Sequence, residues 1–192
     1  MFQREGYNVV KLSATDSLGG YDKEIGTMRL REISNYSLIS LAIPQDKETL
    51  FKKKIKDTFG LNMPSPIETI SNKETRLLFT QPDQIFALTE NSIDPEKDMA
   101  EKFESSAYIT DQTDAWVVLE LSGASSREAL ERICQIDLNK DAFKLNSMAR
   151  TSMEHMSAII VRTSKDTFLL MSASSSAFSF LHAVELSAQH IS

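Results

Sequence analysis

The sequence of 192 residues has few of the residues from which metal and nucleotide sites are usually built. It contains one cysteine, three histidines and six glycines. A single cysteine excludes an internal disulfide and any cysteine cluster that would hold zinc or an iron–sulfur centre. Neither the G-x-G-x-x-G nor the G-x-x-x-x-G-K-[ST] phosphate-binding pattern occurs. The composition therefore indicates a protein without a cofactor of its own.

The charge balance and the hydrophobic runs argue against two classes of partner. Lysine and arginine total 21 against 27 acidic residues, which gives a net charge of -6 and a pI near 5.2. Such a chain is poorly suited to nucleic acid, whose backbone requires a basic surface. No stretch approaches the roughly 18–20 apolar residues of a membrane span, and residues 1–7 lack the apolar segment of a secretory signal. We therefore expect a cytoplasmic protein that binds neither nucleic acid nor membrane.

The hydrophobic pattern predicts one order of elements twice, namely strand, helix, three strands and helix, offset by roughly 80 residues. The first set comprises a strand at 36–43, a helix after Asp46, strands at 67–70, 76–80 and 84–88, and a helix after Asp94. The second comprises a strand at 115–121, a helix after Ser125, strands at 149–153, 156–162 and 167–171, and a helix at 175–190. This order predicts an α+β fold of two-layer α/β sandwich units.

Helix-terminating residues support these helices. Asp46 and Asp94 are suitable N-caps, Gly60 is a suitable C-terminal residue, and Ser125 with Glu128 matches a capping box. The predicted inward residues of the two helices in the second half are Ala129, Leu130, Ile133, Cys134, Phe178, Leu181 and Val184. Residues 1–26 are polar, so we predict an N-terminal arm followed by units at 27–106 and 107–192 that together form one compact domain.

The single residues of chemically reactive types all have a structural explanation. Cys134 lies on an apolar helix face, where a buried thiol is unreactive. His182 and His190 lie on the last helix without a carboxylate to tune them, so a surface role is favoured. We therefore predict no catalytic, cofactor-binding or metal-binding residue.

An ordered series of segments carries a family resemblance. The segments are residues 76–84, 110–123, 134–138, 148–151 and 166–170. In this order they resemble the gamma-subunit family of heterotetrameric sarcosine oxidases, over roughly residues 27–190. More distantly, the series resembles the folate-binding domain of the glycine-cleavage aminomethyltransferase family. This resemblance implies that the chain has the fold of that domain.

The resemblance implies a place in an enzyme assembly. Sarcosine oxidase demethylates N-methylglycine to glycine, releases the one-carbon unit as formaldehyde or methylenetetrahydrofolate, and reduces oxygen to hydrogen peroxide. The implied partners are the alpha, beta and delta subunits, and these subunits are expected to hold FAD, FMN, NAD, tetrahydrofolate and zinc. For this chain the resemblance implies a structural role without catalytic residues.

The alternative function is that of a stand-alone folate-binding protein or one-carbon transferase. The chain differs from the aminomethyltransferase family at one turn that bears on this alternative. Aminomethyltransferases have a glycine-rich turn and an acidic pair where this chain reads Glu154-His155-Met156-Ser157. The missing pair argues against that alternative. An assembly acting on another N-methylated amine remains open, because substrate choice belongs to the flavin subunit.

Three polar residues near this turn are our candidates for partner contact. Arg150, Thr151 and His155 interrupt an otherwise apolar region, and an arginine there is suited to bidentate contacts across an interface. An intramolecular salt bridge or simple solvation of Arg150 is the equally weighted alternative.

Overall fold

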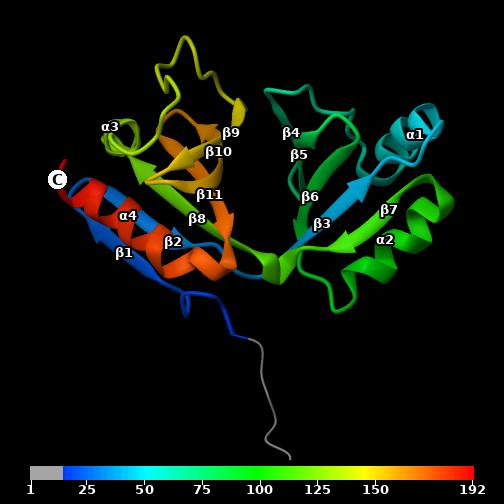
Figure 1. The fold of residues 1–192 in the computed structure, drawn as a ribbon, viewed down its shortest axis with the longest axis horizontal. Helices are drawn as coiled ribbons and strands as arrows, with labels where there is room; N and C mark the ends of the chain where they lie inside the picture. The colour runs from blue at the N-terminus through cyan, green and yellow to red at the C-terminus, as the bar shows by residue number, and fades with distance from the viewer. Residues whose placement is uncertain (1–14) are drawn as a thin grey trace, which may run out of the picture.

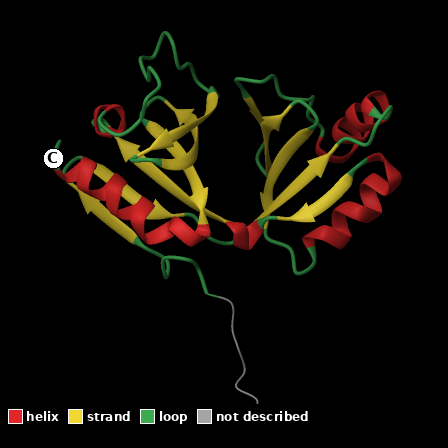
Figure 2. Cartoon of the chain, viewed as in Figure 1, coloured by secondary structure: helices red, strands yellow, loops and turns green. Residues whose placement is uncertain are grey.

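The computed structural model describes residues 15–192 and contains two antiparallel sheets with helices on their outer faces (Figure 1). The six-stranded sheet has the order β1 (Asp22–Ile25), β2 (Met28–Glu32), β8 (Trp116–Gly123), β11 (Thr167–Ala173), β10 (Met156–Ser164) and β9 (Met148–Met153). The five-stranded sheet has the order β4 (Thr69–Ser71), β5 (Thr75–Gln81), β6 (Gln84–Glu90), β3 (Tyr36–Ala42) and β7 (Tyr108–Asp111). Figure 2 shows the strands at the centre of the molecule and the helices outside them.

Each sheet is covered by its own pair of helices. Helices α1 (Glu48–Phe59) and α2 (Pro95–Phe103) cover the five-stranded sheet, and α3 (Ser126–Glu131) and α4 (Ala177–Gln189) cover the six-stranded sheet. The chain therefore runs β3-α1-β4-β5-β6-α2 and then β8-α3-β9-β10-β11-α4. The predicted α+β class and the repeated order of elements are confirmed.

Two strands cross between the repeats and tie them together. Strand β2 directly precedes β3 in the sequence but pairs with β8, in the other sheet. Strand β7 directly precedes β8 but pairs with β3. Apart from β1, each sheet thus has the same strand order, and its last strand comes from the segment leading into the other repeat. The sequence predicted neither of these strands, and units drawn in sequence order, at 27–106 and 107–192, do not represent the crossing.

The predicted arm at residues 1–26 also needs correction. Residues 1–14 lie outside the described part of the chain, whereas residues 22–25 form β1. Only Ile25 of this strand is buried, so the alternating pattern of a strand is absent from the sequence. The Glu32 carboxylate accepts hydrogen bonds from the backbone N–H of Leu18 at 3.0 Å and of Gly20 at 2.8 Å, which holds the preceding segment on β2.

Three apolar clusters hold the layers together. One lies between α1, α2 and the five-stranded sheet, and a second lies between α3, α4 and the six-stranded sheet. The third joins residues of both sheets, with Leu38 and Phe86 from one and Val118 and Met171 from the other. Phe86 meets the ring of Trp116 edge to face, with centroids 5.6 Å apart. The sheets therefore pack face to face, and the helices form the outer layers.

The helix ends agree with the sequence in part. Asp94 caps α2 by accepting a hydrogen bond from the Lys97 N–H, and Gly60 ends α1 in the left-handed conformation, as predicted. The cap predicted at Asp46 is wrong, because this residue has φ of 60° in the preceding turn. The predicted capping box is also wrong. The Ser126 hydroxyl instead lies within hydrogen-bond distance of the carbonyl oxygens of Gly123, at the end of β8, and Asp166, in the turn before β11.

The last helix is fixed to the first strand by an ion pair. Lys23 Nζ of β1 lies 2.5 Å from Glu185 Oε1 of α4, and the Glu185 side chain is 19 % exposed. The hydrogen bond from Lys23 holds the pKa of Glu185 below its ordinary value of 4.5. A carboxyl group with a lowered pKa stabilises the fold above its unfolded-state pKa, and this stabilisation disappears as the pH falls through the folded-state pKa.

Replacement of Lys23 by methionine should therefore make the free energy of unfolding depend less strongly on pH in the acid range. Exposed pairs of this kind contribute about 0.5 kcal/mol. We expect urea unfolding to show a loss of this size near neutral pH, with no difference from wild type once Glu185 is protonated. Lys73→Met is the control, because Lys73 is exposed and forms no ion pair within residues 15–192. An equal loss at all pH values would contradict the assignment.

Candidate functional site

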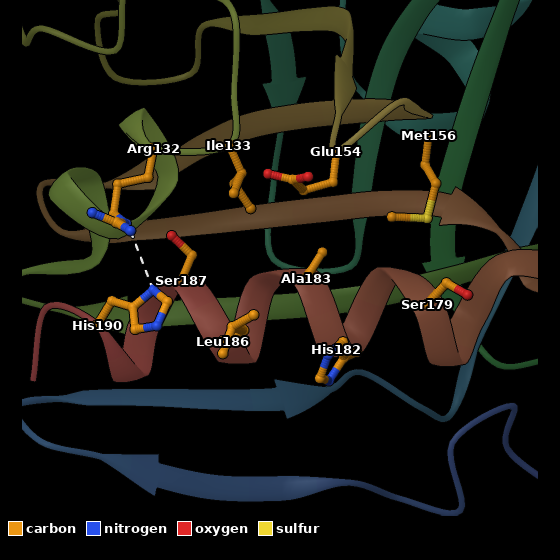
Figure 3. Close-up of a pocket in the computed structure, with 10 residues that line it drawn as sticks. All are labelled: Arg132, Ile133, Glu154, Met156, Ser179, His182, Ala183, Leu186, Ser187 and His190. Atoms are coloured by element: carbon orange, nitrogen blue, oxygen red, sulfur yellow. Dashed lines mark hydrogen bonds between the residues drawn. The ribbon is translucent and has the colours of Figure 1, made fainter.

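A groove runs along the outer side of α4. It has a volume of about 490 Å³ and is bounded by α4, by the residues that follow α3, and by the turn between β9 and β10 (Figure 3). Ile133, Met156, Ala183 and Leu186 give it an apolar lining. The Ser187 hydroxyl donates to the Ala129 carbonyl at 2.7 Å and fixes α4 against α3. The groove is thus framed by packed elements and has the size of an ordinary binding site.

The turn beside the groove has an unusual backbone. Met153 pairs with Met156, so Glu154 and His155 form a two-residue hairpin loop. Both have positive φ, 44° and 67°, which is the conformation that asparagine and glycine favour in such turns. A carboxylate and an imidazole in this place cost backbone strain of the kind often found at functional sites. The turn therefore has a backbone conformation that suits glycine, although neither of its two residues is glycine.

Polar side chains lie along the groove, with Arg132 and His190 at one end and Glu154 about midway. Arg132 Nη2 donates to Nδ1 of His190, 3.2 Å away, and Figure 3 shows this contact at one end of α4. Within residues 15–192, neither Arg132 nor Glu154 forms an ion pair. His182 is exposed on α4. The groove therefore offers an arginine and a carboxylate that have no intramolecular counter-charge in the described structure.

The outer face of α4 corrects one prediction. Leu181 and Val184 are buried as predicted, but Phe178 is 74 % exposed. Leu186 is 41 % exposed. Phe178, His182 and Leu186 follow one another at intervals of four and form a stripe on the solvent side. The prediction failed at Phe178 because an apolar residue in a helical repeat was assigned to the core.

The three residues predicted to contact partners do not share a surface. Arg150 faces the five-stranded sheet, where its Nη1 donates to the Thr80 carbonyl at 3.4 Å. Thr151 lies on the opposite face of β9, and its hydroxyl approaches Cys134. His155 is exposed on the turn next to the groove. Their role in partner contact stays a prediction, and only His155 lies beside the groove.

Cys134 is buried as predicted, but it does not lie on a helix, because α3 ends at Glu131 and Cys134 forms an isolated bridge with Met153. It is 9 % exposed in the cluster beneath α3 and α4, and burial raises the pKa of its thiol. A thiol with a raised pKa is a poor nucleophile at neutral pH.

A second hollow lies where the crossing strands pass between the sheets. Its volume is about 460 Å³, and Glu32, Tyr36 and Asp114 contribute to its lining. The Tyr36 hydroxyl donates to the Trp116 carbonyl at 3.0 Å, and burial together with nearby carboxylates raises the pKa of Tyr36. Across residues 15–192 no group of three or more histidine, cysteine or acidic residues is arranged to hold a metal ion. No helix in this range is long and apolar enough to cross a membrane.

The comparisons with known proteins identify the fold. The family model for the GCVT N-terminal domain matches residues 77–165. The glycine cleavage system aminomethyltransferase T from Bartonella henselae matches with a TM-score of 0.54 and 16 % identity, over 82 % of this chain and 48 % of that one. A chain of the heterotetrameric sarcosine oxidase from Corynebacterium sp. U-96 matches with a TM-score of 0.76 and 18 % identity. This chain has the aminomethyltransferase-like fold.

The extent of the two structural matches differs. The sarcosine oxidase match covers 85 % of this chain and 84 % of the other, so the two chains agree over nearly their whole lengths. Against the aminomethyltransferase, the chain spans about half of the relative's length. The comparison with curated proteins gives no match. The resemblance inferred from the sequence is thus confirmed for the fold, including the distant likeness to aminomethyltransferases.

Proposed function

We propose that this chain is a non-catalytic, structural gamma subunit of a heterotetrameric sarcosine oxidase. The complex would convert sarcosine, oxygen and water to glycine, formaldehyde and hydrogen peroxide, or pass the one-carbon unit to tetrahydrofolate. The alpha, beta and delta subunits are its partners in this proposal, and FAD, FMN, NAD, tetrahydrofolate and zinc are bound by them. We place the complex in the cytoplasm.

The observation that carries the proposal is the structural match to one chain of a heterotetrameric enzyme. It covers 85 % of this chain and 84 % of the other, with a TM-score of 0.76. The match to the aminomethyltransferase covers 48 % of that chain, with a TM-score of 0.54. The higher TM-score and the greater coverage support an oxidase subunit over a transferase.

Co-expression tests the proposal directly. The chain, tagged at its C-terminus, is produced together with the proteins encoded by its neighbouring genes and purified through the tag. We expect a yellow complex in which this chain and the flavin-containing subunits are equimolar and in which sarcosine oxidation produces hydrogen peroxide. A stable monomer that never co-purifies with a flavoprotein would refute the proposal.

The family match to the GCVT N-terminal domain supports a second candidate, a stand-alone folate-binding protein or one-carbon transferase. Isothermal titration of the isolated chain with tetrahydrofolate separates the two. A structural subunit should give no heat of binding, whereas micromolar affinity would favour the second candidate.

A further inference from the structure

The edges of the two sheets are not equally protected. Strands β4 and β9 meet at one side of the molecule, through the bridge between Glu68 and Ser147 and the hydrogen bonds that flank it. Within residues 15–192 the remaining edges are those of β1 and β7, which each pair with one strand only (Figure 1). Three of the four residues of β1 are charged and exposed, which is a usual protection of an edge strand against further pairing. The sequence of β7, Tyr108–Asp111, contains neither lysine nor proline, so its edge lacks this protection.

The internal repeat relates β7 to β2 residue by residue. The Ile33 N–H after β2 donates to the Val118 carbonyl at 2.8 Å, and the Gln112 N–H after β7 donates to the Leu38 carbonyl at 2.8 Å. Each strand therefore has the same register on its neighbour in the sheet. The difference is that β2 is also paired with β1, whereas β7 has no counterpart of β1 within the described residues.

This register shows which backbone groups of β7 lie on the open edge. Ile109 corresponds to Leu30, and Asp111 corresponds to Glu32. The Glu32 N–H donates to the Tyr21 carbonyl, 2.7 Å away, just before β1. Because alternate residues of an antiparallel strand turn their backbone groups to the same side, the N–H and C=O groups of Ile109 and Asp111 face outward. Within residues 15–192 these groups have no backbone partner.

The side chains along this edge select an uncharged strand. In the second repeat, Arg29 and Arg31 of β2 lie opposite acidic residues of β1. The corresponding residues of β7 are Tyr108 and Thr110, both of them exposed. An acidic strand such as β1 would therefore find no counter-charge beside β7, whereas uncharged side chains fit there.

Strand β7 itself meets this requirement. Antiparallel pairing about a two-fold axis between the two Ile109 residues sets Ala107 opposite Asp111 of the second copy. It also sets Tyr108 opposite Thr110, which is a favourable pair of an aromatic and a β-branched residue. Ala107 continues the extended backbone, with φ of -145° and ψ of 151°. No two charges face each other in this arrangement, so the edge is complementary to itself.

We propose that β7 pairs with β7 of a second copy of this chain and joins the two five-stranded sheets into one. The free N–H and C=O groups of Ile109 and Asp111 supply the backbone hydrogen bonds, and the uncharged side chains of the same strand select the occupant. The paired segment is short, so the buried area lies at the low end for specific interfaces and the dimer is weak. The inference goes beyond the proposed function and does not depend on it, because all of its residues lie in this chain.

Sedimentation equilibrium of the full-length chain tests the inference. We expect a monomer–dimer equilibrium in the micromolar range. Tyr108→Lys with Thr110→Lys should raise the dissociation constant more than about tenfold, because like charges then face each other across the axis. Tyr108→Glu with Thr110→Glu should have the same effect. When the lysine and glutamate variants are mixed in equal amounts, they should form a heterodimer, because opposite charges then face each other.

Proline substitutions test the backbone hydrogen bonds, and β1 supplies the matched control. Ile109→Pro removes an outward N–H that β3 does not use, so the dimer should dissociate while β7 stays paired with β3. Ile109→Ala corrects for the lost side chain and should weaken the dimer less. Glu24→Pro makes the same change at the free edge of β1 and should leave the dimer unchanged. Thermal unfolding within a few degrees of wild type shows that a variant is folded, and if the proline variant is not, the exposed lysine and glutamate variants decide.

Four outcomes would overturn the inference. The wild-type chain could stay monomeric at millimolar concentration, or its dimer could survive the lysine substitutions, which would place the interface elsewhere. Deletion of residues 1–14 could turn a monomer into a dimer, which would assign the edge to the chain's own N-terminal segment. The lysine variant could fail to join the co-expressed complex while the free wild type is monomeric, which would assign the edge to another subunit. In every case the proposed function keeps its separate test, which is co-purification with a flavoprotein.

Discussion

Replacement of Gly123 by alanine is expected to destabilise the chain by about 3 kcal/mol or more. Gly123 ends β8 with φ of 122°, a conformation that side chains with a Cβ rarely adopt. A Cβ added there would lie 2.2 Å from the Thr27 carbonyl oxygen and 2.8 Å from the Met28 Cα. Both are backbone atoms at the start of β2, so neither can turn away as a flexible side chain would. The alanine must push β2 away from β8.

A second glycine provides the control for backbone strain alone. Gly60 has φ of 67° at the end of α1, and a Cβ there would have no heavy atom within 4 Å. Gly60→Ala should therefore cost only the left-handed backbone penalty of about 1 kcal/mol. Equilibrium urea unfolding of the two variants measures the difference, which contains the close packing between β2 and β8 and the greater backbone strain at φ of 122°. Equal losses would show that β2 does not approach β8 this closely in solution.

The contrast between these two glycines shows which structural roles can be predicted from the local sequence. Gly60 follows an amphipathic helix, and its local role was predicted correctly from that position. Gly123 also ends an element, but its need for space comes from Met28, which is its partner in the neighbouring strand. A contact with a residue almost a hundred positions away cannot be predicted from the sequence around Gly123. Local periodicity thus predicted the elements and their order, whereas the crossing of β2 and β7 required the structure.

The groove could not be predicted from the sequence for a related reason. Phe178 continues the helical spacing of a core residue, and only the packed helix shows that it faces solvent. Glu154 and His155 form their turn through positive φ values that their residue types do not signal. Arg132 and His190 are 58 positions apart in the sequence and meet only because α4 packs beside α3. One member of the site region, His155, was among the predicted contact residues, because it interrupts an apolar segment.

These features give the proposed subunit two distinct kinds of surface. The inner faces of both sheets contribute residues to the cluster that joins them. On the outer side, the exposed residues of α2 are mostly charged, whereas those of α4 include Phe178 and Leu186. The two repeats share one order of elements but differ in the residues that their last helices expose.

Replacement of Phe103 by alanine should show how strongly the first repeat depends on its own core. Phe103 is the last residue of α2 and is fully buried. Its ring centroid lies 5.9 Å from that of Phe51 and 6.0 Å from that of Phe59, both on α1. Removing the ring loses its apolar burial and leaves a cavity between the two helices, at a cost of about 4 kcal/mol. Since domains unfold with only about 5–15 kcal/mol, this loss leaves a marginal fold.

Phe178→Ala is the matched control, because it makes the same substitution on the equivalent helix of the second repeat. With the ring 74 % exposed, the free chain should lose less than about 0.5 kcal/mol. Urea midpoints of the two variants give both values, and a chain of this length shifts its melting temperature by about 2–4 °C for each kcal/mol. A large loss at Phe178 in the free chain would mean that the ring is packed in the fold, and a small loss at Phe103 would mean that α2 is not anchored on α1. The predicted order, large at Phe103 and small at Phe178, separates a residue of the core from one on the exposed face of α4.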